Sequence, residues 1–264
     1  MQAFTDQTNQ TIFLETPPKR IISLVPSQTE LLYHLGLDEE VVGITKFCVH
    51  PQTWFRTKTR IGGTKNINIE KIKALQPDLV IANKEENVKE QIEALQQFTS
   101  VYISDISTLA EAKQMIVQVG GLVDKTAEAN KLVETIEQQF ELLQNIHPDK
   151  IPAAYFIWRD PYMAAGGDTF INDMMQYCGF ENIFLDKHRY PQINIEQLNE
   201  TGCMVLLLSS EPFPFKEKHI DALQSLLPGV KILLVDGEMF SWYGSRLLLA
   251  PGYFKQLLQQ VKAV

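Results

Sequence analysis

The sequence predicts an α/β protein made of two Rossmann-like lobes with parallel sheets, joined by one long backbone helix. Short apolar runs alternate with helical patterns along most of the chain, which is typical of parallel sheets covered by helices. Residues 124–147 form one helical pattern without Gly or Pro. The tetrapeptide Ile-Asn-Ile-Glu occurs at 67–70 and again at 193–196, each time ahead of a predicted strand. We therefore divide the chain into an N-terminal lobe (1–121), a linking helix (122–148) and a C-terminal lobe (149–264).

Length and composition agree with this division. A chain of 264 residues is long enough for two lobes of ordinary size. A net charge of −8 and an isoelectric point near 5.2 argue against a nucleic-acid partner, which would favour a basic surface. No apolar run approaches the ~20 residues needed to span a membrane. Three cysteines at unrelated spacings form neither a zinc pattern nor a disulfide framework, so we expect buried thiols.

The N-terminal lobe begins with a short β-prone run at 11–14. A nearly continuous apolar run at 20–25 then predicts a buried parallel strand, and the helix after it ends at Gly36. Ser27 or Thr29 is expected to cap that helix. Asn68 is expected to cap the first copy of the repeated motif. The remaining predicted elements are strands at 41–45, 79–82 and 101–103, a polar loop at 83–87, a helix to about 97, and a helix at 108–119 ended by Gly120-Gly121.

The linking helix has a clear apolar face. Its apolar residues recur at alternating spacings of four and three, which places them on one side of a helix; they are Ala129, Val133, Ile136, Phe140 and Leu143. Pro148 follows the predicted end, a usual place for a helix to stop. A helix of roughly 23 residues is about 35 Å long, enough to run between two lobes. An ordinary long helix lying on one sheet is the alternative.

The C-terminal lobe repeats the same plan. Gly179 is expected to end its first helix, and the second copy of the repeat is expected to start another helix at 193. An aromatic loop at 237–246 precedes the closing helix. The predicted strands are 153–158, 204–208 and 231–235, and the predicted first and last helices are 170–178 and 247–261.

Several stretches of the chain are similar to one protein family. They are RIISLVPSQTELLYHLGL at 20–37, NINIEKIKALQPDLVIA at 66–82, CGFENIFLD at 178–186 and RYPQINIEQL at 189–198. Together with the long helix they resemble the substrate-binding proteins of ABC importers for cobalamin, ferric siderophores and haem. The cobalamin-binding branch is the most similar, and the resemblance extends from about residue 19 to 264. It implies two α/β lobes joined by a single helix.

The resemblance implies a role for the glutamate in each copy of the repeat. In the cobalamin-binding proteins, a glutamate at this point of each lobe docks onto basic pockets of the membrane permease. Glu70 and Glu196 occupy these positions. The alternative is that a glutamate in the first turn of a helix is favoured by the helix dipole and needs no partner.

A ligand is expected in a cleft between the lobes, at the carboxyl ends of the strands. The resemblance implies that Phe47 and Tyr190 face the ligand and that Arg246 matches an arginine of the family. Asn83 stands where the most similar relatives carry an aromatic residue. Each aromatic side chain could instead belong to the core. The predicted ligand-binding residues are Phe47, Asn83, Trp158, Tyr162, Tyr190, Trp242, Tyr243 and Arg246.

Catalysis and resident cofactors are not expected. The five histidines are scattered without an HExxH pattern, and no GxSxG motif is present. We therefore predict a monomeric binding protein that is not an enzyme, with no metal site and no intrinsic cofactor. Its ligand would be cobalamin or another metal chelate, such as haem or a siderophore complex, and its partner would be an ABC permease.

Two features depart from the family pattern. The family is exported, but the first residues of this sequence show neither a basic nor an apolar signal region. The cobalamin-binding relatives also pair a cysteine at the position of Cys178 with one in the last helix, where this chain has none. A periplasmic location follows from the resemblance, but a cytoplasmic one is compatible with both features. The alternative function is a cytosolic enzyme or chaperone that handles a corrinoid or tetrapyrrole.

Overall fold

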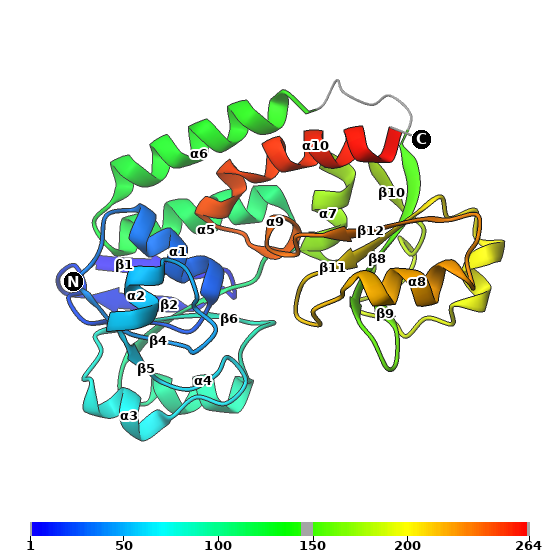
Figure 1. Cartoon of the computed structure of the whole chain (residues 1–264). Helices are drawn as coiled ribbons and strands as arrows, with labels where there is room; N and C mark the ends of the chain where they lie inside the picture. The colour runs from blue at the N-terminus through cyan, green and yellow to red at the C-terminus, as the bar shows by residue number, and fades with distance from the viewer. Residues whose placement is uncertain (1, 144–149, 263–264) are drawn as a thin grey trace. The chain divides into compact units, whose positions relative to one another are not determined.

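The computed structural model describes residues 2–143 and 150–262, and the chain forms two compact α/β units (Figure 1). Unit 1 comprises Met1–Ile106, Ala110–Thr135 and Tyr243–Arg246, and unit 2 comprises Ser107–Leu109, Ile136–Trp242 and Leu247–Val264. Each unit is built on a parallel sheet, so the predicted fold class is confirmed.

The chain passes from one unit to the other within helix α6 (Thr126–Glu141). Four residues of the predicted apolar face are buried, Ala129, Ile136, Phe140 and Leu143, whereas Val133 is half-buried and Leu132, which was not predicted, is buried. The helix begins two residues later than predicted because Asp124 has a left-handed backbone conformation, with a φ of 57°. The last predicted residues, 144–147, lie outside the described residues, and the lobe and linker boundaries remain a prediction.

The sheet of unit 1 has the strand order β5-β4-β3-β6-β7, with every neighbouring pair parallel. The strands are β3 (Ile21–Ser23), β4 (Val41–Ile44), β5 (Thr59–Arg60), β6 (Leu79–Asn83) and β7 (Ser100–Ser104). All residues of β3 and β6 are buried, as expected for central strands covered on both faces.

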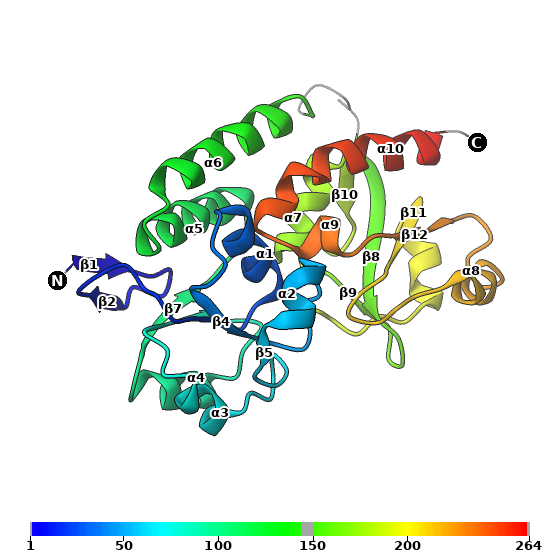
Figure 2. The same cartoon turned by 60° about the vertical axis from the view of Figure 1, so that its left-hand side comes forward.

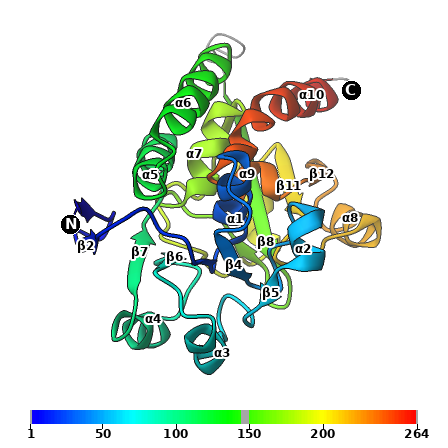
Figure 3. The same cartoon turned by 90° about the vertical axis from the view of Figure 1, so that its left-hand side faces the viewer.

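Helices cover both faces of this sheet. In Figure 3, α1 (Pro26–His34) and α5 (Leu109–Leu122) lie on one side of the strands, and α3 (Ile69–Ala74) and α4 (Lys89–Gln96) lie on the other. A short helix, α2 (Gln52–Thr57), leads into the edge strand β5. The loops that follow the strands therefore gather at the carboxyl end of the sheet, where ligand sites of α/β proteins form.

A two-stranded antiparallel hairpin precedes the sheet and was not predicted as a pair. It joins β1 (Gln2–Thr5) to β2 (Thr11–Leu14). The Asp6 carboxylate shapes the turn by accepting hydrogen bonds from the backbone N–H groups of Thr8 and Gln10. The predicted strand at 11–14 is confirmed, and its alternating burial places Ile12 and Leu14 in the core.

The predicted cap of α1 is wrong. The helix begins at Pro26, and neither Ser27 nor Thr29 caps it. Proline suits the first helical position because its missing N–H would have no partner there. The Thr29 hydroxyl instead donates to the carbonyl oxygen of Val25 over 2.9 Å. The predicted stop at Gly36 is confirmed by its positive φ of 83°.

The predicted end of α5 at Gly120-Gly121 is also wrong. The helix continues through both glycines to Leu122. An added Cβ at Gly120 would lie 2.3 Å from the Cβ of Ala129 and 3.1 Å from the carbonyl oxygen of Lys125. Gly120 therefore allows the first turn of α6 to approach α5 closely, and it serves packing rather than termination.

The sheet of unit 2 has the strand order β10-β8-β11-β12, with parallel pairs, and β9 pairs antiparallel with β8. Thr169 caps the helix Phe170–Tyr177 and Gly179 ends it, as predicted for Gly179. The strands are β8 (Ile151–Trp158), β9 (Met163–Ala164), β10 (Phe180–Asn182), β11 (Val205–Ser209) and β12 (Lys231–Val235), and the helices are α7 (Phe170–Tyr177), α8 (Glu217–Gln224), α9 (Glu238–Ser241) and α10 (Ala250–Lys262).

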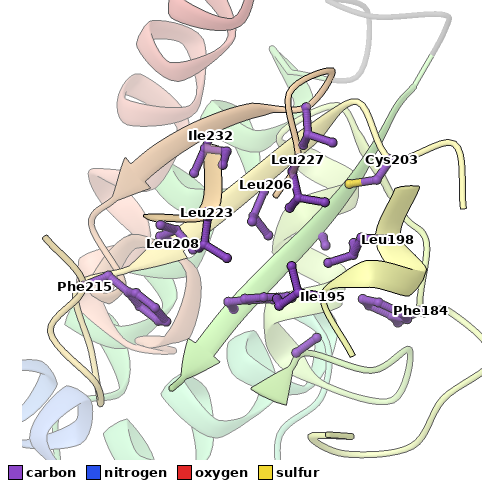
Figure 4. Packing of buried hydrophobic residues seen from close by; sticks show 14 residues of the cluster. Phe184, Ile195, Leu198, Cys203, Leu206, Leu208, Phe215, Leu223, Leu227 and Ile232 are labelled. Atoms are coloured by element: carbon purple, nitrogen blue, oxygen red, sulfur yellow. The ribbon is translucent and has the colours of Figure 1, made fainter. Parts of the chain in front are cut away.

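Two layers of helices cover this second sheet. Figure 2 shows α8 on one side of the strands and α7 and α9 on the other. Leu223 of α8 and Leu227 lie over Leu206 and Leu208 of β11 in a buried apolar cluster (Figure 4). On the opposite face, the ring of Tyr155 packs against Phe240 of α9 at a centroid distance of 5.1 Å.

The second copy of the repeated motif differs from the first. Glu70 lies in the first turn of an α-helix that Asn68 caps by accepting a hydrogen bond from the N–H of Lys71. Glu196 instead begins a short 3-10 helix, η1 (Glu196–Glu200). The Asn194 side chain accepts from the N–H of Glu196 itself, which is a turn rather than a helix cap. The helix predicted to start at 193 therefore begins at 196 and is a short 3-10 helix.

Candidate functional site

The carboxyl end of the sheet in unit 1 rests on buried polar side chains. The Thr29 hydroxyl oxygen lies 2.8 Å from the Ser23 hydroxyl oxygen and 3.0 Å from the Cys48 sulfur atom. Thr45 lies 3.1 Å from the same sulfur atom. Burial raises the pKa of the Cys48 thiol, so this sulfur is a neutral partner of the two hydroxyl groups. The network fixes the start of α1 and the loop after β4.

Asn83 orders the loop after β6. Its side-chain oxygen accepts hydrogen bonds from the N–H groups of Glu85 and Glu86, at 2.8 and 2.9 Å. Its side-chain nitrogen donates to the Ser104 carbonyl oxygen over 3.2 Å. Asn83 is 3% exposed and occupied by these bonds. The structure thus places it beneath the loop, and ligand contact by Asn83 stays a prediction.

Phe47 has a different position. It lies three residues after the end of β4, in the loop that follows the strand, and is half-exposed. The neighbouring Lys46 ammonium lies 5.0 Å from the centre of the Phe47 ring. Gly63 lies beneath both side chains, since an added Cβ would be 3.2 Å from the Phe47 ring and 3.3 Å from the Lys46 chain. An exposed aromatic face at the carboxyl end of a parallel sheet can stack against a flat ligand.

Two predicted ligand residues from the C-terminal part of the chain belong to unit 1. The Tyr243 hydroxyl donates to the Glu86 carboxylate over 2.6 Å. Arg246 makes a bidentate pair with Glu30, at 3.0 and 2.7 Å. Gly244 packs against the Ser27 carbonyl oxygen, which an added Cβ would approach to 2.7 Å. These contacts fasten the segment Tyr243–Arg246 onto the start of α1 and the loop after β6.

The carboxyl end of the sheet in unit 2 is aromatic. Trp158, the last residue of β8, is 40% exposed, and its ring packs against Phe213 at 5.8 Å. Phe213 in turn packs against Phe215 at 4.8 Å. Tyr162 packs against Phe156 at 5.6 Å and is partly buried. The structure therefore brings Trp158 and Tyr162 to the same end of this sheet.

Trp242 is turned into unit 2. Its indole N–H donates to the Glu211 carboxylate over 2.9 Å, and the Ser241 hydroxyl donates to the same oxygen over 2.7 Å. Burial raises the pKa of Glu211, and the hydrogen bond from Ser241 opposes this rise. Trp242 is 6% exposed, so its ring acts chiefly within the unit. Tyr190 is half-buried in the segment between β10 and η1.

Both candidate docking residues are on the surface. The Glu70 side chain is 83% exposed and forms an i,i+3 ion pair with Lys73 at 3.2 Å. Glu196 is also exposed. An exposed pair such as that with Lys73 is worth only about 0–1 kcal/mol, so another partner can replace it.

The three cysteines are free and buried. Burial also raises the pKa of Cys178, and that of Cys203 to about 11. Over residues 2–143 and 150–262, no group of three His, Cys, Asp or Glu side chains is arranged to hold a metal ion. No helix in the same ranges is long and apolar enough to cross a membrane.

Sequence reasoning missed several residues of these two regions. Glu30, Glu86 and Glu211 hold Arg246, Tyr243 and Trp242, but a carboxylate gives no sign of its distant partner in one sequence. Phe213 and Phe215 carried a usable signal. They form the run Phe-Pro-Phe in the loop after an apolar strand, which is the place where a ligand loop is expected.

Two α/β units, each with a parallel sheet, are an architecture in which small-molecule sites form at the carboxyl ends of the strands. Residues 21–226 match the family model described as periplasmic binding protein, and the chain belongs to this family. The predicted resemblance is thereby confirmed. The family consists of substrate-binding proteins for transport and not of enzymes.

Individual relatives agree with this assignment. A vitamin B12-binding protein of Vibrio campbellii is 31% identical over 190 residues, which are 70% of this chain and 69% of that protein. The structure of the periplasmic vitamin B12 binding protein BtuF of Vibrio cholerae has a TM-score of 0.79 at 23% identity, covering 94% of this chain and 99% of that one. The haem-binding protein HutB of the same organism has a TM-score of 0.77 at 21% identity, covering 90% and 98%. The two structural likenesses concern the fold.

Proposed function

We propose that this chain is the substrate-binding component of an ABC importer and that its ligand is a cobalamin-like corrinoid or another metal chelate, such as haem or a ferric siderophore. Family membership supports the transport role. The exposed aromatic rings of Phe47 and Trp158, each at the carboxyl end of a parallel sheet, are the observation that carries the ligand class. Corrinoids and haem are large and flat, and aromatic walls suit them.

The predicted ligand residues then divide into two groups. Phe47, Trp158, Tyr162 and Tyr190 contact the ligand in this proposal, since each is exposed or half-exposed. The other four are buried and hydrogen-bonded within their own unit, and they hold the loops that carry the contacts; they are Asn83, Trp242, Tyr243 and Arg246. We further infer a monomer that acts outside the cytoplasm, without catalysis or a resident cofactor.

The direct test is calorimetry of the purified chain with cobalamin, cobinamide, haem and ferric siderophores. The proposal predicts that at least one chelate binds with a micromolar or lower dissociation constant. A thermal shift provides a second readout, because ligand at 100 times its dissociation constant adds about 2.7 kcal/mol of stability. Binding no tighter than millimolar across the whole panel would refute the ligand class.

Delivery to a permease is assigned to Glu70 and Glu196, one in each unit. Two contacts on one body raise the effective concentration of the second, so removing either should weaken docking strongly. We expect Glu70→Ala and Glu196→Ala to preserve ligand affinity and to impair association with the permease in a pull-down, with the double variant weaker still.

Glu90 and Glu217 provide matched controls. Each is an exposed glutamate in the first turn of another helix, α4 in unit 1 and α8 in unit 2. Glu90→Ala and Glu217→Ala should leave permease association unchanged. If the Glu70/Glu196 double variant associates with the permease as well as these controls do, the two glutamates have no docking role and only stabilise the helices that they begin.

A further inference from the structure

Basic residues are concentrated in one segment of an otherwise acidic protein. Residues 46–73 include seven Lys and Arg residues and one acidic residue, Glu70, so this segment carries a net charge of +6. The whole chain carries −8, and the remaining residues therefore carry −14. The segment lies entirely in unit 1. This separation of charge gives unit 1 a surface region whose sign is opposite to that of the rest of the protein.

Three cations of this segment are joined by direct contacts across adjacent elements. The strand β5 lies between α2 and α3 in Figures 1, 2 and 3. The Arg60 guanidinium of β5 lies 4.3 Å from the centre of the Phe55 ring of α2 and donates to the Phe55 carbonyl oxygen. The Lys71 ammonium of α3 donates to the Arg60 carbonyl oxygen over 2.7 Å. Arg56 follows Phe55 in α2, and we call Arg56, Arg60 and Lys71 the basic face.

The charges of the basic face are not compensated by carboxylates of the chain. All three residues are exposed, and over residues 2–143 and 150–262 none of them forms an ion pair. Arg60 and Lys71 donate to carbonyl oxygens, which carry no net charge. The neighbouring Lys58 differs, because it pairs with Asp38 at 2.9 Å. The basic face therefore keeps three positive charges available to an anionic partner.

The surroundings of the basic face are typical of a membrane–water interface. The cations are spread over two helices and a strand, which suits an extended charged surface better than one small anion. Aromatic rings accompany them: the half-buried Phe55 ring lies beside Arg60, and the Lys73 ammonium lies 5.5 Å from the centre of the exposed Phe98 ring. Aromatic rings next to Lys and Arg are common where a protein meets lipid headgroups.

The basic face also adjoins a residue that we assign to permease docking. Glu70 directly precedes Lys71 in α3. A permease lies in a membrane, so contact with it through Glu70 would bring α3 and the basic face close to the surrounding lipid headgroups. Anionic headgroups attract Lys and Arg within about one Debye length, ~8 Å at physiological ionic strength.

We infer that the basic face binds the phosphate groups of anionic phospholipids and that this contact orients unit 1 at the membrane beside the permease. The position beside the permease rests on the proposed function, whereas lipid binding requires neither the transported ligand nor the permease. Each Lys or Arg near an anionic membrane favours binding by roughly fivefold. The negative charge of the remaining residues opposes this gain, so we expect weak, reversible binding that salt abolishes.

The experiment is sedimentation of the full chain with vesicles of phosphatidylcholine alone or mixed with phosphatidylglycerol. The wild type should sediment with the mixed vesicles at about 20 mM salt, not with phosphatidylcholine alone, and should be released at about 500 mM salt. Arg56→Gln/Lys71→Gln removes two charges of the basic face and should weaken binding by about tenfold or more. Arg56→Lys/Lys71→Arg keeps both charges and should bind as the wild type does. Circular dichroism verifies that each variant is folded.

A matched control removes the same charge from elsewhere on the surface. Lys131 of α6 and Lys218 of α8 are exposed, and both lie outside the basic segment 46–73. Lys131→Gln/Lys218→Gln changes the net charge as much as Arg56→Gln/Lys71→Gln does and should leave vesicle binding unchanged. If the two double variants lose binding equally, the effect comes from net charge and the assignment to the basic face is wrong.

The outcomes separate this inference from the proposed function. If the wild type sediments no more with the mixed vesicles than with phosphatidylcholine at low salt, lipid binding is overturned, while ligand calorimetry still decides the proposed function. If no chelate binds but the mixed vesicles do, the basic face stands and only its position beside a permease is lost. If Arg56→Gln/Lys71→Gln weakens association with a permease in lipid-free detergent as much as it weakens vesicle binding, the partner is an acidic protein surface and the lipid assignment is wrong.

Discussion

The last residues of β3, β6 and β7 in unit 1 are Ser23, Asn83 and Ser104, whereas the corresponding end of unit 2 carries Trp158 and Phe213. The two units share a parallel topology, but the carboxyl end of unit 1 is held by hydrogen bonds between buried polar side chains, whereas that of unit 2 adds ring packing to the hydrogen bonds of Ser209 and Glu211. Hydrogen bonds fix loop positions closely and leave little polar surface exposed. Rings fill volume and leave part of their faces open to a ligand.

The segment Trp242–Arg246 binds carboxylates in both units. The Trp242 indole N–H binds the Glu211 carboxylate in unit 2, while the next residue, Tyr243, binds Glu86 in unit 1. Arg246 then pairs with Glu30 in unit 1. The carboxylates differ in their partners: Glu30 has a bidentate guanidinium, whereas Glu211 forms no ion pair in the part of the chain that the structure describes.

The largest effect is expected from breaking the ring packing in unit 2. Phe240 is fully buried, and its ring lies 5.1 Å from Tyr155 and 4.9 Å from Phe254. Phe240→Ala should lower the free energy of unfolding by about 3–5 kcal/mol, because it removes apolar contacts and leaves a cavity. Urea unfolding followed by circular dichroism measures this loss. Phe240→Leu keeps most of the volume and should cost clearly less; equal costs would argue against a cavity effect.

The ion pair of unit 1 should rank second. Arg246→Met removes the guanidinium that binds both oxygens of Glu30, and the two side chains are only 10% and 21% exposed. We expect a loss of about 1.5–3 kcal/mol in the free energy of unfolding, as for hydrogen bonds to charged groups. Lys187→Met is the control, since its pair with Asp186 is exposed and should cost about 0–1 kcal/mol. Equal losses of unfolding free energy in the two variants would show that the ion pair between Arg246 and Glu30 stabilises the fold no more than an exposed pair does.

The third prediction uses the unpaired carboxylate of unit 2. The pKa of Glu211 is raised in the folded protein, so the folded state holds this proton to a higher pH than the unfolded chain does. Its contribution to stability therefore falls as pH rises from the ordinary glutamate pKa through the raised folded value. Glu211→Gln removes this dependence.

The measurement is the difference in unfolding free energy between Glu211→Gln and the wild type from pH 4.5 to 7. It should shift in favour of the variant as pH rises. A difference that is constant over this pH range would contradict the assigned burial effect.

The smallest effects should come from the two copies of the repeat. Glu70→Ala should cost about 0.3–1 kcal/mol, because Glu70 lies in the first turn of α3 and pairs with Lys73. Glu196→Ala should cost less, since the short 3-10 helix η1 has fewer aligned peptide dipoles. Urea unfolding of the two variants and the wild type measures both losses of unfolding free energy. A larger loss in Glu196→Ala than in Glu70→Ala would contradict the expected order.

The sequence predicted the sheets well because buried parallel strands are continuous apolar runs, as at β6 and β11. The prediction failed where the identity of a residue is required by a partner elsewhere in the structure. Gly120 could not be distinguished from a helix stop, because Ala129 is what requires a glycine there. The short strands β9 and β10 were missed, since two or three residues carry no periodicity.

The candidate site shows the same limit. Phe47 was predicted from the family resemblance and from its loop after a strand, and Trp158 from its place at the end of a strand; both side chains are exposed. The burial of Asn83, Trp242, Tyr243 and Arg246 depends on carboxylates, carbonyls and hydroxyls up to 216 residues away in the chain. The order of residues in the sequence contains no information about those pairings. The structure was therefore needed to distinguish the four buried residues from the exposed Phe47 and Trp158.

The central claim is that one exposed ring at the carboxyl end of each sheet binds the ligand, and a single set of titrations tests it most directly. Phe47→Ala, Trp158→Ala and their double variant are titrated with the metal chelate that binds the wild type. Phe13→Ala, at an exposed ring of the β1–β2 hairpin, is the control. We predict that each site variant loses about 1–2 kcal/mol, roughly five- to thirtyfold in dissociation constant, and that the control loses nothing. A double variant that binds as tightly as Phe13→Ala would contradict the claim.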